Sequence, residues 1–224
     1  MKRLITFALL ALASMPVAAR EPRTHLRPAA NPSAVIAREL EFSQAAQDKG
    51  QWTAFREFAA KDAVMFVPQM VLAQGWLKDR PNPPVAVRWQ PQEVWSSCDG
   101  SLVVSKGAWQ GPKASGWFTT IWQRHGDGGY KWVYDHGDTL QEAQPVPEMI
   151  PAHVADCPAR RAPRAAKAAP APFDPLRRSG RSDDGSLVWE VTATAEGAHN
   201  LSIEWTHDGA TAPLLIEEVA APEK

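Results

Sequence analysis

Apolar residues recur at helical spacing in the first patterned stretch of the chain. Asn31-Pro32 places a capping side chain before a proline suited to the first helical turn, and Gly50 supplies a stop. This pattern predicts an amphipathic helix from Asn31-Pro32 to Gly50, with Val35, Ile36, Leu40, Phe42 and Ala46 on one side. A second, shorter helix is expected over 52–60, with Trp52 and Phe55 on one side.

The pattern then changes to short, strand-like runs separated by tight turns. Ala63 to Val67 forms an apolar run that Pro68 stops, and a Pro-rich loop follows over 79–84. Val94 to Cys98 and Leu102 to Trp109 flank Asp99-Gly100, a pair typical of a hairpin turn. Trp117 to Arg124 and Tyr130 to His136 form another pair. Helices followed by an antiparallel meander predict an α+β fold.

Alternation along the strands predicts which side chains share a face of the sheet. Pairing Tyr130 with Arg124 would place Trp132 opposite Trp122, Tyr134 opposite Thr120 and His136 opposite Phe118. Trp95 would lie opposite Val104, and Lys106 would share the face if the register is even. The predicted ligand pocket therefore consists of Trp95, Phe118, Thr120, Trp122, Trp132, Tyr134 and His136. A slip of one residue would break this face apart.

The order of these elements, with SCDGSLVVSKGAW and GWFTTIWQRHGDGGYKWVYDHGD in the meander, resembles the nuclear transport factor two-like (NTF2-like) superfamily and its SnoaL-like branch over about residues 31–142. The resemblance implies a curved antiparallel sheet wrapped around helices, in the form of a cone with a pocket. It implies isomerase, dehydratase, epoxide hydrolase, cyclase or binding functions. The position of the superfamily's isomerase base corresponds to Val67, and the first predicted helix holds no Tyr, so isomerase chemistry of that design is not expected.

Few residues suggest a reaction. His136, with Asp138 or Lys106, is a candidate acid or base, because imidazole titrates near neutral pH. A His hydrogen-bonded at a strand end and a Lys on the surface are the simpler interpretations. The histidines lack metal-ligand spacing, and the sequence holds no phosphate loop or GxSxG elbow, so neither a metal nor a cofactor is expected.

The first nineteen residues predict export. Lys2 and Arg3 precede an apolar run from Leu4 to Ala13, and Val17-Ala18-Ala19 has the small residues of a cleavage site. We therefore expect a signal peptide cleaved after Ala19, a flexible lead-in over 20–30 and a periplasmic or secreted protein. An uncleaved anchor is the alternative, although the run is short for a membrane span. In an oxidising compartment the two cysteines, Cys98 and Cys157, would form a disulfide.

Composition allows one or two small domains. The chain has 224 residues, a formal net charge of -1 and 44% hydrophobic residues, which suffices for a core. Segment 158–182 holds seven Lys or Arg and one Asp, whereas 183–224 holds one Lys and nine acidic residues. The basic segment is Pro-broken, with Phe173 as its one aromatic residue, which favours a solvated linker over nucleic-acid binding.

Three alternating runs over 183–224 predict a small three-stranded appendage that must cover its apolar face. It would pack on the cone domain, residues 31–157, or on a second copy in a homodimer. No stable membrane insertion is expected after signal cleavage. Three functions remain: an exported domain that binds a small, largely apolar molecule; a lyase, isomerase or hydrolase that uses His136; and a structural dimer module with a filled pocket.

Overall fold

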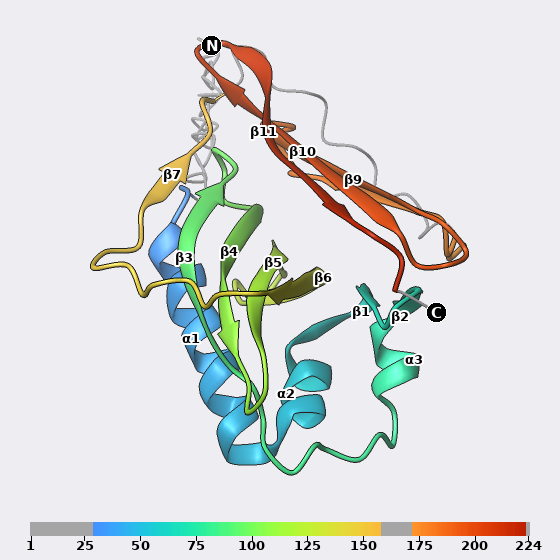
Figure 1. Ribbon diagram of the computed structural model, residues 1–224. Coiled ribbons are helices and arrows are strands. Elements are labelled where there is room, and N and C mark those ends of the chain that lie inside the picture. Colours follow the sequence, from blue (N-terminus) through green and yellow to red (C-terminus); the bar gives the residue numbers. More distant parts are fainter. Residues whose placement is uncertain (1–28, 158–171, 223–224) are drawn as a thin grey trace, which may run out of the picture.

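The structure of the protein is a computed structural model that describes residues 29–157 and 172–222. The predicted signal peptide, most of the lead-in and residues 158–171 of the predicted linker lie outside the described residues. Two sheets and three helices form the described part of the chain (Figure 1). Its fold is α+β, as the sequence predicts. None of the helices in the described ranges is long and apolar enough to cross a membrane.

Helix α1, Pro32–Lys49, begins and ends where the sequence predicts. The Asn31 side chain accepts a hydrogen bond from the Ala34 backbone N–H at 3.3 Å, and Gly50 ends the helix with a φ of 96°. Helix α2, Gln51–Phe58, follows directly, and strand β1, Ala59–Phe66, begins four residues before the predicted strand. Strand β2, Met70–Leu72, and helix α3, Ala73–Leu77, complete this part of the chain.

The larger sheet has seven strands in the order β2-β1-β6-β5-β4-β3-β7. The meander is present as predicted, but β1 pairs with β6 and β3 pairs with β7 in parallel, so the expected antiparallel sheet is in fact mixed. The two strands of each parallel pair are far apart along the chain: α3, the Pro-rich loop and β3 to β5 lie between β1 and β6, and β4 to β6 lie between β3 and β7. These segments supply the long connections that parallel pairing needs. The remaining strands are β3 Arg88–Ser96, β4 Leu102–Gln110, β5 Ser115–Arg124, β6 Tyr130–Leu140 and β7 Ala152–Val154.

The C-terminal sheet has four antiparallel strands, in the order β11-β10-β9-β8, where the sequence predicts three. The difference is β8, Arg177–Arg181, which falls inside the predicted linker and pairs with β9. Its sequence, RRSGR, carries no apolar alternation because the strand lies at the sheet edge with its side chains largely exposed. The other strands are β9 Leu187–Ala193, β10 His199–His207 and β11 Ala210–Val219.

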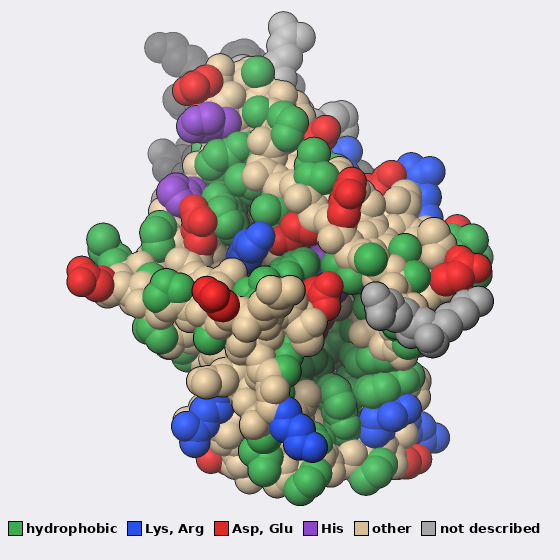
Figure 2. Space-filling model, in the orientation of Figure 1, with side chains coloured by type: hydrophobic (Ala, Val, Ile, Leu, Met, Phe, Trp, Pro, Cys, Tyr) green, Lys and Arg blue, Asp and Glu red, His purple; other side chains and the backbone are tan. Residues whose placement is uncertain are grey.

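Each face of the seven-stranded sheet carries its own apolar core. On one face α1 and α2 pack against Trp89, Trp122 and Trp132. On the other face the C-terminal sheet contributes residues such as Leu187, Trp189 and Leu201, which pack against residues including Trp95 and Tyr134. The C-terminal sheet therefore covers the second face of the seven-stranded sheet within the same chain. Hydrophobic side chains also gather in a hollow in the lower half of the molecule (Figure 2).

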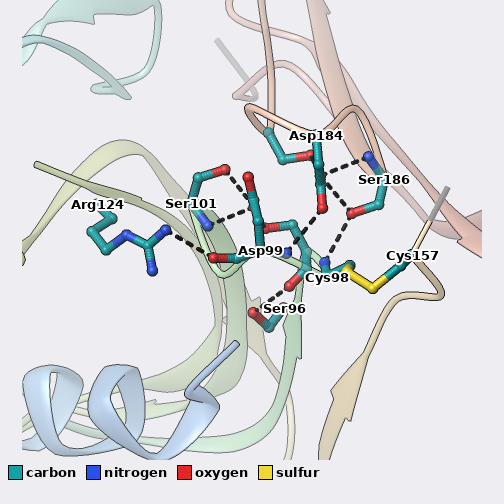
Figure 3. Close-up of a disulfide and its surroundings, with 10 residues drawn as sticks. Ser96, Cys98, Asp99, Ser101, Arg124, Cys157, Asp184 and Ser186 are labelled. Atoms are coloured by element: carbon teal, nitrogen blue, oxygen red, sulfur yellow. Dashed lines mark hydrogen bonds between the residues drawn. A yellow bond between two sulfur atoms is a disulfide. The ribbon is translucent and has the colours of Figure 1, made fainter. Parts of the chain in front are cut away.

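A disulfide between Cys98 and Cys157 confirms the predicted pairing of the two cysteines. Cys98 lies in the turn between β3 and β4, and Cys157 follows β7 (Figure 3). The same turn contacts the C-terminal sheet, because the Cys98 backbone N–H donates to Ser186 Oγ at 2.9 Å. One corner of the molecule thus joins the β3–β4 hairpin, the segment after β7 and the C-terminal sheet.

Candidate functional site

The predicted pocket residues divide between the two faces of the sheet. Phe118, Trp122 and Trp132 belong to the core on the helix side, and Thr120 lies on that face with Asp135. Trp95 and Tyr134 belong to the core under the C-terminal sheet. His136 joins them on that face, where it contacts Glu217 of β11 and His199 of β10. The seven residues therefore do not line one pocket.

Two features of register cause this division. Strand β4 pairs with β5 so that Val104 lies opposite Ile121 and Lys106 opposite Thr119, an odd register, whereas the shared face required an even one. Between β5 and β6, Trp122 lies opposite Trp132 as predicted, but the pairing shifts and Tyr134 lies opposite Ile121. This bulge at Val133 reverses the faces of all residues after it. It turns Tyr134 and His136 away from the helices and turns Asp135 toward them.

A cavity of about 340 Å³ lies on the helix side of the sheet, near α2. Its volume is in the range of small-molecule sites. The polar side chains along its wall are Gln51, Thr120, Asp135 and His136. Aromatic rings form much of the remaining wall: Phe42, Trp52, Phe55, Phe66, Trp89, Trp109 and Phe118.

Asp135 is the acidic residue of this cavity. It lies in β6 between Thr120 of β5 and Met65 of β1, and all three residues line the cavity. Thr120 Oγ1 donates a hydrogen bond to Asp135 Oδ2 at 2.7 Å. Burial raises the pKa of Asp135 to about 7, although the bond from Thr120 favours the ionised form and opposes that rise. A carboxyl group with this pKa exchanges its proton near neutral pH and can donate or accept a hydrogen bond toward a ligand.

A second buried carboxylate, Glu39 of α1, contacts Trp89 of the cavity wall. It occupies the apolar stripe of the helix between Val35 and Phe42 and is fully buried. It accepts hydrogen bonds from Trp89 Nε1 at 2.8 Å, Trp122 Nε1 at 2.8 Å and Ser105 Oγ at 2.6 Å. Burial raises its pKa, while these three donors stabilise the ionised form. Glu39 thus fixes the positions of two indole rings.

His136 and Lys106, the candidate catalytic pair, meet at Glu217 between the two sheets. Lys106 Nζ lies 2.6 Å from Glu217 Oε1, and His136 Nε2 lies 2.8 Å from Glu217 Oε2. His136 Nδ1 contacts His199 Nε2 at 3.0 Å, so both ring nitrogens have partners in the protein. Burial lowers the pKa of His136, and Glu217 opposes this. Asp138, the third candidate, is exposed and hydrogen-bonds its neighbour Thr139.

Sequence reasoning missed Glu39, Asp135 and Glu217. Glu39 left a signal, since it is an acidic residue at a core position of an amphipathic helix. Asp135 was masked by the bulge, because strict alternation places it on the outer face. Glu217 comes from a strand far along the chain, and no local pattern connects it to His136.

One group of side chains in the described ranges has metal-ligating atoms close together. Asp156, His207 and Asp208 bring such atoms within 4.8 Å of one another, and all three residues are exposed. None of the three residues belongs to a predicted site or lines the cavity. Exposed acidic groups of this kind are common in proteins that bind no metal there, so we assign it no role.

No protein-family model and no curated protein sequence matches the chain. Among solved structures, a candidate ketosteroid isomerase from Parabacteroides distasonis is 16% identical, with a TM-score of 0.38, and the match covers 52% of this chain and 98% of that one. An NTF-2 like protein of unknown function from Burkholderia xenovorans is 14% identical, with a TM-score of 0.34, over 51% and 89% of the two chains.

An LEH-like epoxide hydrolase from M. tuberculosis is 18% identical, with a TM-score of 0.32, and the match covers 48% of this chain and 80% of that one. The similarity to NTF2-like proteins that the sequence implies is therefore found among solved structures, at the level of the fold. The SnoaL-like branch stays a prediction.

Proposed function

We propose that this protein is an exported NTF2-like domain that binds a small, largely apolar molecule in the cavity beside α2. The observation that carries the proposal is the cavity itself, about 340 Å³ in volume with seven aromatic side chains along its wall. Binding against such a wall is favourable because it removes apolar ligand surface from water, and a few polar groups orient the ligand. Asp135 and Thr120 supply those groups.

The proposal of export rests on the N-terminal sequence. Lys2 and Arg3, the apolar run and the Val17-Ala18-Ala19 site form a signal-peptide pattern, and the disulfide suits an oxidising compartment. A binding role fits the candidate residues better than catalysis by His136, since the protein itself occupies both imidazole nitrogens.

Titration with the uncharged dye N-phenyl-1-naphthylamine tests the binding site, because its fluorescence rises in an apolar environment. Val87 lines the cavity and Val85 does not, although the two belong to the same loop; Val85 is 58% exposed. We expect saturable binding to the wild type, at least about tenfold weaker binding to Val87→Trp, which fills the cavity, and unchanged binding to Val85→Trp. Equal binding to all three proteins would overturn the proposal.

Native mass spectrometry of protein taken from the periplasm of expressing cells supplies the natural ligand. We expect a retained mass with the wild type that is absent from Val87→Trp.

N-terminal sequencing of the same material tests export, with a mature N-terminus at Arg20 as the expected result. A chain that remains in the cytoplasm and begins at Met1 would contradict export.

A further inference from the structure

One oxygen of the Asp135 carboxyl group, Oδ1, has no hydrogen-bond partner among the described residues. Thr120 Oγ1 donates to Oδ2, and within the described part of the chain Thr120 is the one hydrogen-bond partner that this side chain has. Asp135 also keeps part of its surface accessible and lines the cavity wall. A bound molecule can therefore reach Oδ1 directly.

Among residues 29–157 and 172–222, none that lines the cavity offers this carboxylate a cationic partner. None of the described lining residues is Lys or Arg. Lys106 belongs to the opposite face of the sheet, where it pairs with Glu217 at 2.6 Å. His136, the other titratable residue of the wall, uses its two ring nitrogens on Glu217 and His199.

The charged groups around Asp135 are of its own sign. From α1, Glu39 raises the pKa of Asp135 through its negative charge, in addition to the larger effect of burial. From β1 the facing residue is Met65, from β5 it is Thr120, and α2 contributes Gln51, Trp52 and Phe55 to the wall. Two carboxyl groups thus share one apolar region without a counter-ion from the lining residues.

The aromatic wall suits a cation. The faces of Phe, Tyr and Trp rings carry negative potential, and rings grouped around a cavity bind organic ammonium ions. The indole N–H groups of Trp89 and Trp122, which would repel a cation, both donate to Glu39 and so already have a partner in the protein.

We infer that the ligand of this cavity is a small organic ammonium ion, with its charged nitrogen beside Asp135 and its apolar part against the aromatic wall. This inference rests on the proposed function and names its ligand class. It accounts for a carboxyl group in an apolar cavity whose described lining residues include no Lys or Arg. The bound cation supplies the positive counter-charge that the described lining residues do not provide. It thereby stabilises the ionised form of Asp135.

A matched pair of ligands tests the inference. Benzyltrimethylammonium and its uncharged carbon isostere, neopentylbenzene, have nearly the same shape, and each is measured by displacement of N-phenyl-1-naphthylamine. At pH 8 we expect the cation to bind about tenfold more tightly than the isostere. At pH 6 the cation should bind about tenfold more weakly than at pH 8, because a group of pKa about 7 is then mostly protonated. The isostere should show no such change.

Variants assign the effect to Asp135. Asp135→Asn keeps the shape of the side chain, and should lose the preference for the cation and its pH dependence while it still binds the isostere. Asp138→Asn changes an exposed carboxylate three residues along the same strand that does not line the cavity, and should behave as the wild type. If Asp135→Asn fails to fold, carbon-13 carboxyl titration of the wild type replaces it: the cation, but not the isostere, should lower the pKa of Asp135.

The outcomes separate this inference from the proposed function. Equal binding of the two ligands, or tighter binding of the isostere at pH 8, overturns the ammonium ligand and leaves an apolar binding site. A preference for the cation that Asp135→Asn retains also overturns it. Failure of both ligands and of the dye to bind overturns the proposed function itself.

Discussion

Asp99 and Asp184 occupy equivalent positions in two turns that bind each other. Asp99 Oδ1 accepts hydrogen bonds from Ser97 Oγ and from the Ser101 N–H and Oγ. Asp184 Oδ1 accepts the same three bonds from the corresponding serines of its own turn. The two segments read SCDGSL and SDDGSL, over 97–102 and 182–187.

The contact between these turns is reciprocal. The Cys98 N–H donates to Ser186 Oγ at 2.9 Å, and the Asp183 N–H donates to Ser101 Oγ at 2.8 Å. The Asp99 N–H also donates to Asp184 Oδ2 at 2.9 Å (Figure 3). Together with the nearby disulfide, these bonds attach the C-terminal sheet to the β3–β4 turn of the seven-stranded sheet.

Replacement of Asp184 should weaken that attachment. Asp184→Ala removes one acceptor group and leaves four donors without their partner, so we expect a loss of about 2 kcal/mol in the free energy of unfolding, measured with urea. The bonds to its carboxylate hold the pKa of Asp184 below its usual value despite burial. Its stabilisation is therefore present at neutral pH and is lost as the pH falls through the lowered pKa. Glu196→Ala, an exposed change in the turn between β9 and β10, should have little effect; equal losses for both variants would contradict the prediction.

The disulfide should stabilise the protein mainly through the unfolded chain. Cys98 and Cys157 are 59 residues apart, and closing a loop of that length is worth about 4 kcal/mol in the chain-entropy model. We expect Cys98→Ser/Cys157→Ser to lose an amount of this order in urea unfolding. Thiol counting of unreduced, denatured protein from the periplasm should find no free thiol. Two free thiols would show that the bond does not form there.

Glu39 should be costly to replace. Glu39→Ala leaves the indole N–H groups of Trp89 and Trp122 and the Ser105 hydroxyl without an acceptor in the core, which should destabilise the fold by about 3 kcal/mol. Gln44→Ala, on the exposed side of α1, is the matched control.

The same residue should leave a signature in the pH dependence of stability. Burial raises the pKa of Glu39 in the folded protein, so the native state binds this proton more tightly than the unfolded chain. The resulting stabilisation is complete at low pH, below the unfolded pKa, and is lost as the pH rises through the folded pKa. Glu39→Gln cannot titrate. We subtract the unfolding free energy of Glu39→Gln from that of the wild type, both measured in urea at several pH values. This difference should fall as the pH rises, and a constant difference would refute the assignment.

His136 should affect stability more than binding. His136→Ala leaves His199 Nε2 and one oxygen of Glu217 without their partner between the sheets, and we expect a loss of about 2 kcal/mol. Dye binding should change by no more than about threefold. Loss of all binding with an unchanged unfolding free energy would instead place His136 against the ligand. Loss of turnover of an identified substrate, with binding and stability intact, would establish an enzyme.

Local patterns were sufficient for much of the fold. Helix α1 follows from Asn31, Pro32 and Gly50, whose preferences are set by their own backbone chemistry. The hairpin at Asp99-Gly100 and the pairing of Trp122 with Trp132 likewise follow from turn chemistry and alternation. The cysteine pair was predictable because the chain has two.

The site depended on information that no local pattern contains. A bulge of one residue at Val133 turns Asp135 toward the helices and turns His136 toward the C-terminal sheet, and alternation cannot reveal where a strand gains a residue. Parallel pairing of β1 with β6, strand β8 without apolar alternation, and Glu217 beside His136 all arise from contacts between distant segments. The sequence alone determined the two N-terminal helices, the strands of the meander and their turns, because those choices depend on neighbouring residues. Only the tertiary structure decided which face each side chain occupies and which charges meet, because register and sheet packing are set by the whole core at once.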